Sequence, residues 1–243
     1  MSDDKPSRSP GGSDILRHEA RAREFEPPAA STGTEEIEQH FARVFGEPQS
    51  VFHEIVSDIV HIDVHIIPPR PVRDHWTLFT TGMSDLPMNV PKHIEGAEQF
   101  AFAELMLMLP ASWEVGSDVE RWYWPLRWLK QLARLPHEYN TWLGALHTIP
   151  NGDPPKPFSP ETNLCCWLLL PPVGVDEADQ TITLKDGRVV NIYCLLALHR
   201  EEVSLKLNKG GEALIEALDA AGVSEVLQID RPPAVRKKLF GLF

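Results

Sequence analysis

The chain has 243 residues, enough for one large domain or two small ones. Its 35 acidic and 23 basic side chains give a formal net charge of −12, which argues against general nucleic-acid binding and against attachment to anionic membrane surfaces. The composition, 42% hydrophobic and 24% charged, is typical of a folded globular protein.

The first segment, residues 1–33, predicts a mostly disordered tail. It is rich in Ser, Pro, Gly and Ala, and it offers too little apolar area to offset the entropy of ordering. Residues 234–243 predict a short basic tail at the other end. Of the net charge, −1 belongs to residues 1–33 and +4 to the residues from Arg231 on, which leaves −15 on residues 34–230. We therefore expect one strongly acidic folded domain over residues 34–233.

Apolar periodicity predicts the elements in the first half of this domain. Helical spacing predicts a helix over residues 37–45, with Thr32 and Glu35 as its capping box. The period then changes to two, which predicts strands. These strands cover residues 51–55, 62–66 and 75–80. In residues 100–109 both the even-numbered and the odd-numbered positions are apolar, apart from Glu104. This pattern predicts a central strand covered on both faces.

The second half combines helices with two further strands. Ser117 and Glu120 predict the start of a helix, which Pro125 interrupts, and Pro136 predicts the first turn of another short helix through Leu143. Four prolines within residues 150–158 predict a long loop. Two strands are then expected over residues 163–170 and 189–198, joined by a hairpin that turns at Asp186 and Gly187, followed by helices over residues 201–207 and 211–221.

The number of cysteines and the length of the apolar runs indicate the cellular compartment in which the protein works. Three cysteines, two of them adjacent (Cys165 and Cys166), do not predict a disulfide framework. The longest apolar run, Leu164 to Leu170, is far shorter than the roughly 20 residues of a membrane-spanning helix. The N-terminus lacks the basic start and apolar stretch of a secretory signal. We therefore expect a cytoplasmic protein that binds neither membranes nor nucleic acid.

Several motifs resemble the Suppressor of fused family, in particular its bacterial single-domain members. They are Val60 to Pro69 (VHIDVHIIPP), Trp76 to Met88 (WTLFTTGMSDLPM) and Ala103 to Trp113 (AELMLMLPASW), with weaker matches at Ala145 to Ile149, in the Asp-Pro-Pro-Lys-Pro-Phe loop and at Glu201 to Leu207. The resemblance covers residues 35–233. It implies a three-layer α/β/α fold with a mixed sheet, no cofactor and a role in binding another protein. Bacterial members are similar to proteins proposed as immunity factors that neutralise toxins.

The sequence His61-x-Asp63-x-His65 is the strongest candidate for enzymatic chemistry. Alternate residues of a strand point to one face, so two imidazoles and a carboxylate there are a candidate metal site. Two observations favour a structural role instead. Neighbours two apart on a strand are nearly 7 Å from one another, and no HExxH or Cys-x-x-Cys motif supplies further ligands.

Two other features favour structural roles over catalysis. Gly82 to Asp85 (GMSD) is not a nucleophile elbow, because Leu86 occupies the position of the second glycine. Glu104 is the lone charge of an apolar strand and needs a partner, since an unpaired buried carboxylate costs several kcal/mol. From their position in the family motifs, we expect a partner-binding site among Asp63, Met83, Asp85, Met88 and Glu104.

These observations favour a non-enzymatic, protein-binding domain that acts through its acidic surface. The resemblance implies that the partner is a toxin, and charge complementarity favours a basic one. The alternative is a metal-dependent hydrolase that uses His61, Asp63 and His65. A third hypothesis is a regulator that binds a short peptide by strand addition.

Overall fold

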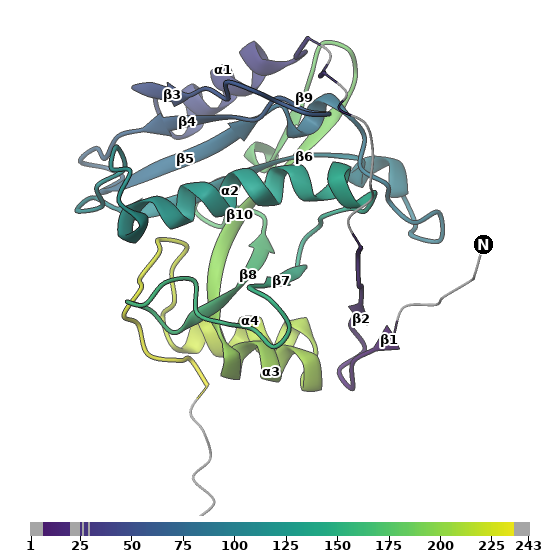
Figure 1. Cartoon of the computed structure of the whole chain (residues 1–243), viewed down its shortest axis with the longest axis vertical. Coiled ribbons are helices and arrows are strands. Elements are labelled where there is room, and N and C mark those ends of the chain that lie inside the picture. Colours follow the sequence, from purple (N-terminus) through teal and green to yellow (C-terminus); the bar gives the residue numbers. More distant parts are fainter. Residues whose placement is uncertain (1–6, 20–24, 26, 29, 236–243) are drawn as a thin grey trace, which may run out of the picture.

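The computed structural model describes residues 7–19, 25, 27–28 and 30–235 (Figure 1). Most of the predicted basic tail, residues 236–243, lies outside the described residues, as do residues 1–6, 20–24, 26 and 29 of the predicted N-terminal tail. Among the helices that are described, none combines the length and the apolar character needed to cross a lipid bilayer. The three cysteines are buried free thiols.

An eight-stranded mixed sheet forms the centre of the protein. Its strands are β3 (Ser50–Phe52), β4 (Asp63–Ile67), β5 (His75–Thr81), β6 (Phe102–Pro110), β7 (Thr148–Pro150), β8 (Leu164–Leu170), β9 (Thr181–Thr183) and β10 (Val189–His199). The spatial order is β3-β4-β5-β6-β10-β8-β7, and β9 pairs with the first residues of β10. The two central strands, β6 and β10, are parallel to each other, whereas the other neighbouring pairs are antiparallel.

Helices cover both faces of this sheet (Figure 1). They are α1 (Thr34–Val44), α2 (Glu120–Tyr139), α3 (Arg200–Lys209) and α4 (Gly211–Ala220), with single 3₁₀ turns at η1 (Met83–Asp85), η2 (Ala97–Phe100) and η3 (Glu177–Asp179). The long helix α2 packs on one face, while α1 and α4 pack on different parts of the other. The predicted three-layer α/β/α sandwich with a mixed sheet is thereby confirmed.

The central strand β6 is buried on both faces, as its sequence predicts. Leu105 and Leu107 point into the core under α2, and Met106 and Met108 point into the core under α1. This arrangement explains why nearly every residue of the strand is apolar, since neither face of it meets water.

Helix α2 differs from the prediction, because it runs without a break from Glu120 to Tyr139 and contains both Pro125 and Pro136. An internal proline costs a helix roughly 3 kcal/mol. The buried face of α2 includes Trp124, Leu126, Leu129 and Leu132, and each such side chain contributes about 1.5–3 kcal/mol on burial. Packing against the sheet therefore outweighs the local cost of the prolines.

The residues that precede helix α1 also differ from the prediction. The predicted capping box does not form, because Gly33, with φ of 98°, is the N-cap residue of α1 and the Thr32 hydroxyl instead accepts a hydrogen bond from Arg188. Within the predicted tail, β1 (Ser7–Arg8) and β2 (Asp14–Ile15) form a small hairpin. The Gly11 N–H at its turn donates to the Leu207 carbonyl of α3 at 2.7 Å.

The predicted hairpin in the second half is correct in its pairing, because β8 and β10 are antiparallel neighbours. The turn at Asp186 and Gly187 joins β10 to the short strand β9, which the sequence did not predict. Arg188 follows this turn directly, and its side chain reaches the N-terminal end of α1.

Candidate functional site: a polar cluster at one end of the sheet

Charged and polar side chains gather at the end of the sheet where β4 begins, β5 ends and β6 begins. They come from three segments far apart in the sequence, and we call them the polar cluster: His53, Glu54, Ser57, His61, Asp63, Ser84, Asp85 and Glu104. The backbone itself is tightly packed here. A Cβ atom on Gly82, whose φ is 100°, would lie 1.8 Å from the His61 carbonyl oxygen, so only glycine fits this position.

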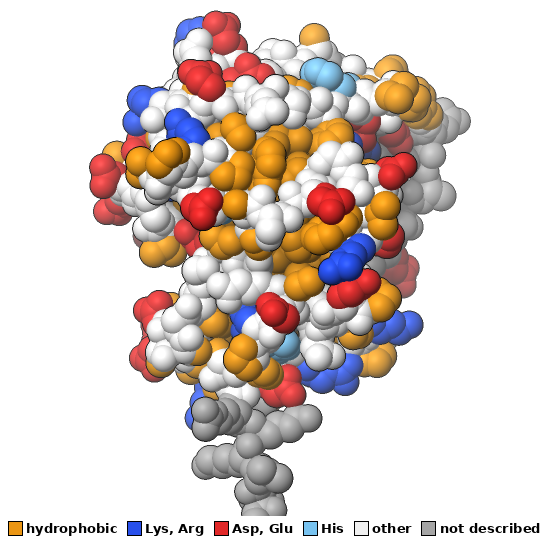
Figure 2. All heavy atoms as spheres, turned by 90° about the vertical axis from the view of Figure 1, so that its left-hand side faces the viewer, with side chains coloured by type: hydrophobic (Ala, Val, Ile, Leu, Met, Phe, Trp, Pro, Cys, Tyr) orange, Lys and Arg blue, Asp and Glu red, His pale blue; other side chains and the backbone are white. Residues whose placement is uncertain are grey.

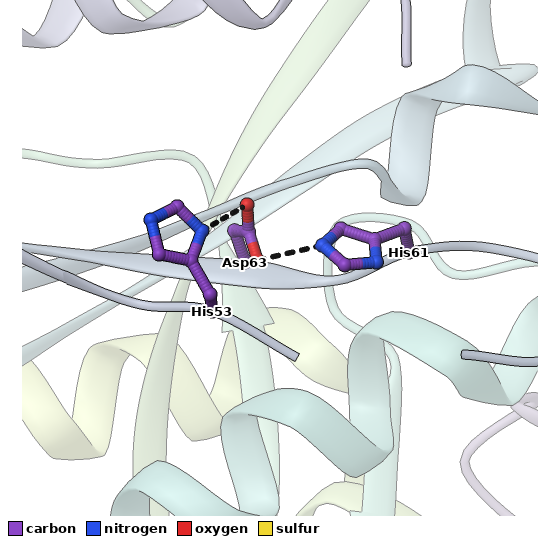
Figure 3. Close-up of side chains that lie close together, drawn as sticks. All are labelled: His53, His61 and Asp63. Carbon is purple, nitrogen blue, oxygen red and sulfur yellow. Dashed lines mark hydrogen bonds and ion pairs between the residues drawn. The ribbon is translucent and has the colours of Figure 1, made fainter. Parts of the chain in front are cut away.

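At the outer part of the cluster the Asp63 carboxylate lies between two imidazoles (Figure 3). One oxygen, Oδ2, is 2.9 Å from His53 Nδ1, and the other, Oδ1, is 3.0 Å from His61 Nε2. The geometry follows from the register of β3 and β4, which pairs Phe52 with Val64 and so places the next residue, His53, opposite Asp63. The arrangement suits the binding of a cation or the sharing of a proton.

Behind these three side chains lies a second layer of hydrogen bonds. The Ser57 hydroxyl is 2.7 Å from His61 Nδ1 and donates to Glu54 Oε2 at 2.8 Å. The backbone N–H of Glu54 donates to Asp63 Oδ1 at 3.2 Å, and the Glu54 carboxylate pairs with Arg134 of α2. Ser57 is buried and directed at Glu54, so its hydroxyl positions His61 rather than facing a substrate.

His65, the third residue of the predicted metal motif, lies outside this group. Its side chain is 2% exposed, stacks on Phe79 with ring centroids 4.6 Å apart, and places Nε2 3.0 Å from Thr81 Oγ1. Helix α1 covers it, with Glu38 at 3.2 Å from Nδ1. Burial lowers the pKa of His65 to about 4. The structure therefore brings His61 and Asp63 together with His53 and leaves His65 in the core.

Glu104 occupies the inner part of the cluster and is fully buried. Its carboxylate accepts hydrogen bonds from Thr80 Oγ1 at 2.6 Å and from the N–H and hydroxyl of Ser84 at 2.9 and 2.7 Å. Burial raises the pKa of Glu104 to about 7, against the opposing effect of these three donors. The side chain holds η1 in place and thereby explains the lone charge in β6.

Asp85 and Arg188 tie the same turn to the start of α1. Asp85 Oδ1 accepts from the Thr32 N–H at 3.0 Å and from the Ser31 hydroxyl at 3.1 Å. Arg188 donates to the Ser84 carbonyl at 2.6 Å and to Thr32. Burial raises the pKa of Asp85, and these neighbours act in the opposite direction.

Three of the expected partner-binding residues are buried inside the domain. Met83, Met88 and Glu104 are 0%, 5% and 0% exposed. Met83 and Met88 lie in the core under α2, and Glu104 bonds only within the chain among the described contacts. These three residues support one loop from inside the domain, and their contact with a partner stays a prediction. Contact of Asp63 and Asp85 with a partner stays a prediction.

A second candidate surface lies at the opposite end of the sheet, where β5 begins and β6 ends. Trp76 Nε1 donates to the Ala111 carbonyl at 3.2 Å, and the rings of Trp113 and Trp122 meet edge to face with centroids 5.0 Å apart. Val119, at the N-cap of α2, is 56% exposed. We call Trp76, Val119 and Trp122 the tryptophan face, and the buried Trp113 supports it from the core.

Figure 2 views the molecule from the side on which α2 begins. Hydrophobic side chains gather in the middle of this face, and charged side chains lie around them. Interfaces between proteins have this anatomy, with an apolar centre rich in aromatic residues and a polar rim. The sequence contained the signal in its five tryptophans between residues 113 and 142, but periodicity alone did not separate the core side chains from those at the surface.

The domain is thus a three-layer α/β/α sandwich. One end of its sheet carries the structural polar cluster, and the other end carries an apolar surface suited to contacts with another protein. The family model for Suppressor of fused protein (SUFU) matches residues 58–232. This match covers more than half of the chain, so the chain belongs to the SUFU family, a family of protein-interaction domains.

Solved structures of the family share the fold. A SUFU homologue from Neisseria gonorrhoeae is 16% identical, with a TM-score of 0.61 over 84% of this chain and 97% of that chain. The matched chain of the Sufu–Fu complex is 17% identical, with a TM-score of 0.59 over 86% of this chain and 93% of that one. Drosophila Suppressor of Fused is 16% identical with a TM-score of 0.59, and this chain, of which 84% is covered, spans 51% of it. No curated protein matches the sequence significantly.

Proposed function

We propose that this domain binds a basic protein through the tryptophan face and that the partner is a toxin whose activity the binding blocks. The observation that carries the proposal is the group of hydrophobic side chains on the face shown in Figure 2, together with the exposed Val119 and the partly exposed Trp76 and Trp122 at the end of the sheet where α2 begins. Support for a protein partner comes from the family and from the Sufu of the Sufu–Fu complex, which has the same fold.

The energetics support this surface as the contact. Apolar area that leaves water on binding contributes about 25 cal/mol per Å², so Val119 and the exposed parts of Trp76 and Trp122 favour association. Tryptophans are also enriched among the residues that dominate protein interfaces. The charge of the chain supports the choice of partner, because a net charge of −12 accelerates the encounter with a basic protein at low ionic strength.

Two further parts of the proposal concern chemistry and compartment. A role as a binding protein needs no catalysis, and Ser57, the hydroxyl nearest to a histidine–aspartate pair in the polar cluster, is buried and points to a carboxylate. The buried free thiols of Cys165, Cys166 and Cys194 support a reducing compartment, and we propose the cytoplasm.

The first test captures the partner from the native cell with the full chain and identifies it by mass spectrometry. We expect one basic protein whose retention falls as salt is raised. Val119→Arg should abolish this retention, because it adds to the proposed contact a charge of the same sign as the basic partner. Ile55→Arg is the matched control: Ile55 is 98% exposed on the loop at the opposite end of the sheet, so this variant should retain the partner. Equal losses in both variants, or indifference to salt, would refute the proposed interface.

The second test addresses the toxin. The captured protein, expressed alone in a heterologous host, should arrest growth, and co-expression of this chain should restore it. Co-expression of Val119→Arg should fail to restore growth, while Ile55→Arg should succeed. A captured protein that is harmless by itself would contradict neutralisation while leaving the binding interface intact.

A further inference from the structure

The side chains of His53 and His61 lie on either side of the Asp63 carboxylate (Figure 3). One nitrogen from each ring and one carboxylate oxygen all lie within 4.8 Å of one another. Two imidazole nitrogens and one carboxylate oxygen form a common ligand set for zinc and related divalent ions of the first transition series. We propose that this triad binds Zn²⁺.

A tetrahedral ion requires one ring to move. Zinc lies about 2.0–2.2 Å from nitrogen and oxygen ligands, so its ligand atoms are about 3.4 Å apart. The two rings contact different oxygens of Asp63, with His53 Nδ1 2.9 Å from Oδ2 and His61 Nε2 3.0 Å from Oδ1, and the three candidate ligand atoms lie within 4.8 Å of one another, so one ring must shift toward the oxygen that the other ring contacts. The His53 ring is 70% exposed and free of core packing, so rotation about its side-chain bonds closes its distance to His61.

The second layer of hydrogen bonds matches what a metal site requires. A histidine that binds metal through one nitrogen is held by a partner on the other, and His61 has this arrangement, with Ser57 Oγ 2.7 Å from Nδ1. Ser57 is fixed by Glu54, and Glu54 is anchored by Arg134 on α2. The Glu54 N–H in turn orients Asp63. Two of the three ligands therefore need little ordering when the ion binds.

The number of protein ligands indicates which kind of zinc site the triad forms. A structural zinc site is closed by four protein ligands, whereas three ligands leave a position for water or another donor. The ion would occupy the space between the end of β3 and the start of β4, where it cross-links the loop of residues 53–62 to the sheet. This inference does not rest on the proposed partner interface, which lies at the other end of the sheet.

The test uses the full chain, freed of any histidine tag and treated with a chelator, in calorimetric titrations with ZnCl₂. We expect one Zn²⁺ per chain. His53→Ala, His61→Ala and Asp63→Asn should each weaken binding at least about 10-fold, and Ser57→Ala should weaken it about 10- to 100-fold, as second-layer changes do. The matched control is His93→Ala, which removes an exposed histidine elsewhere in the chain and should leave binding unchanged.

A fold measurement accompanies each titration. Because His53 is largely exposed, His53→Ala should keep the circular dichroism spectrum and melting temperature of the wild type. A wild-type stoichiometry well below one, or binding by His53→Ala as tight as by the wild type, would overturn the proposal. Equal weakening by His93→Ala would overturn it as well, because it would indicate diffuse binding to surface histidines.

Discussion

The buried carboxyl group of Glu104 predicts a specific pH dependence of stability. Its pKa is about 7 in the folded protein against 4.5 for an unperturbed glutamate. Between these two pH values the folded chain keeps a proton that the unfolded chain releases, so the contribution of Glu104 to folding becomes less favourable as pH rises. A difference of about 2.5 pH units at about 1.4 kcal/mol each amounts to about 3 kcal/mol of stability lost between pH 4.5 and 7.

The variant Glu104→Gln isolates this contribution. Its side-chain carbonyl can accept the two bonds from Ser84, and its amide can donate to Thr80 Oγ1. The Thr80 hydroxyl then turns to the Leu105 carbonyl, which is 3.3 Å away. Because glutamine does not titrate, the variant should gain about 3 kcal/mol relative to the wild type as pH rises from 4.5 to 7.

The assay is urea unfolding of both proteins at pH values from 4.5 to 8, followed by tryptophan fluorescence. Differences between variant and wild type remove the contributions of the other titratable groups, which the two proteins share. Glu98→Gln serves as the control, because Glu98 is exposed and its replacement should give a difference that does not change with pH. A Glu104→Gln difference that is also constant, or that favours the wild type at high pH, would refute the argument.

Two further predictions concern stability elsewhere. Arg231 forms a buried bidentate pair with Glu202, in which the two guanidinium nitrogens are each 2.6 Å from a carboxylate oxygen. Arg231→Met should lower the free energy of unfolding by about 3–5 kcal/mol, because it leaves a buried charge unpaired. Adding Glu202→Gln should recover part of this loss, and a double variant no more stable than the single one would contradict the pairing. Gly82→Ala should lower the melting temperature far more than Gly222→Ala. Both glycines have positive φ, but of the two only a Cβ atom at residue 82 would meet backbone atoms. Gly222→Ala therefore measures the conformational cost alone, about 1–2 kcal/mol, and equal effects of the two variants would show that the contact with His61 is unimportant.

The layers of the fold were predictable because apolar periodicity records which faces are covered. The double-sided pattern of β6 and the alternation in β4 and β5 placed the central strands correctly. The break predicted at Pro125 was wrong for a physical reason, since a local backbone penalty of roughly 3 kcal/mol competes with long-range burial that a local reading does not count. The short strand β9 was missed because three residues carry too little periodicity.

The metal motif illustrates the same limit at the level of the site. Spacing within one strand joined His61 and Asp63 to His65, but the side chain of His65 lies under α1. The actual neighbour, His53, comes from the adjacent strand end, and only the register of β3 against β4 reveals it. The Cα atoms of residues i and i+2 within a strand are nearly 7 Å apart, whereas those of directly opposed residues on neighbouring strands lie within about 5.5 Å. Candidate sites on sheets are therefore better sought across strands than along them.

The family motif around residues 82–85 has a structural explanation that bears on where a partner binds. Gly82 is required by the approach of the His61 backbone, Ser84 completes the bonds of Glu104, and Asp85 holds the start of α1. Each residue thus has a role inside the chain that is independent of any partner. This loop therefore has the properties of a structural support within the domain. The tryptophan face contributes no hydrogen bond to the polar cluster among the described contacts, so a substitution at Val119 should test the proposed interface without disturbing that cluster.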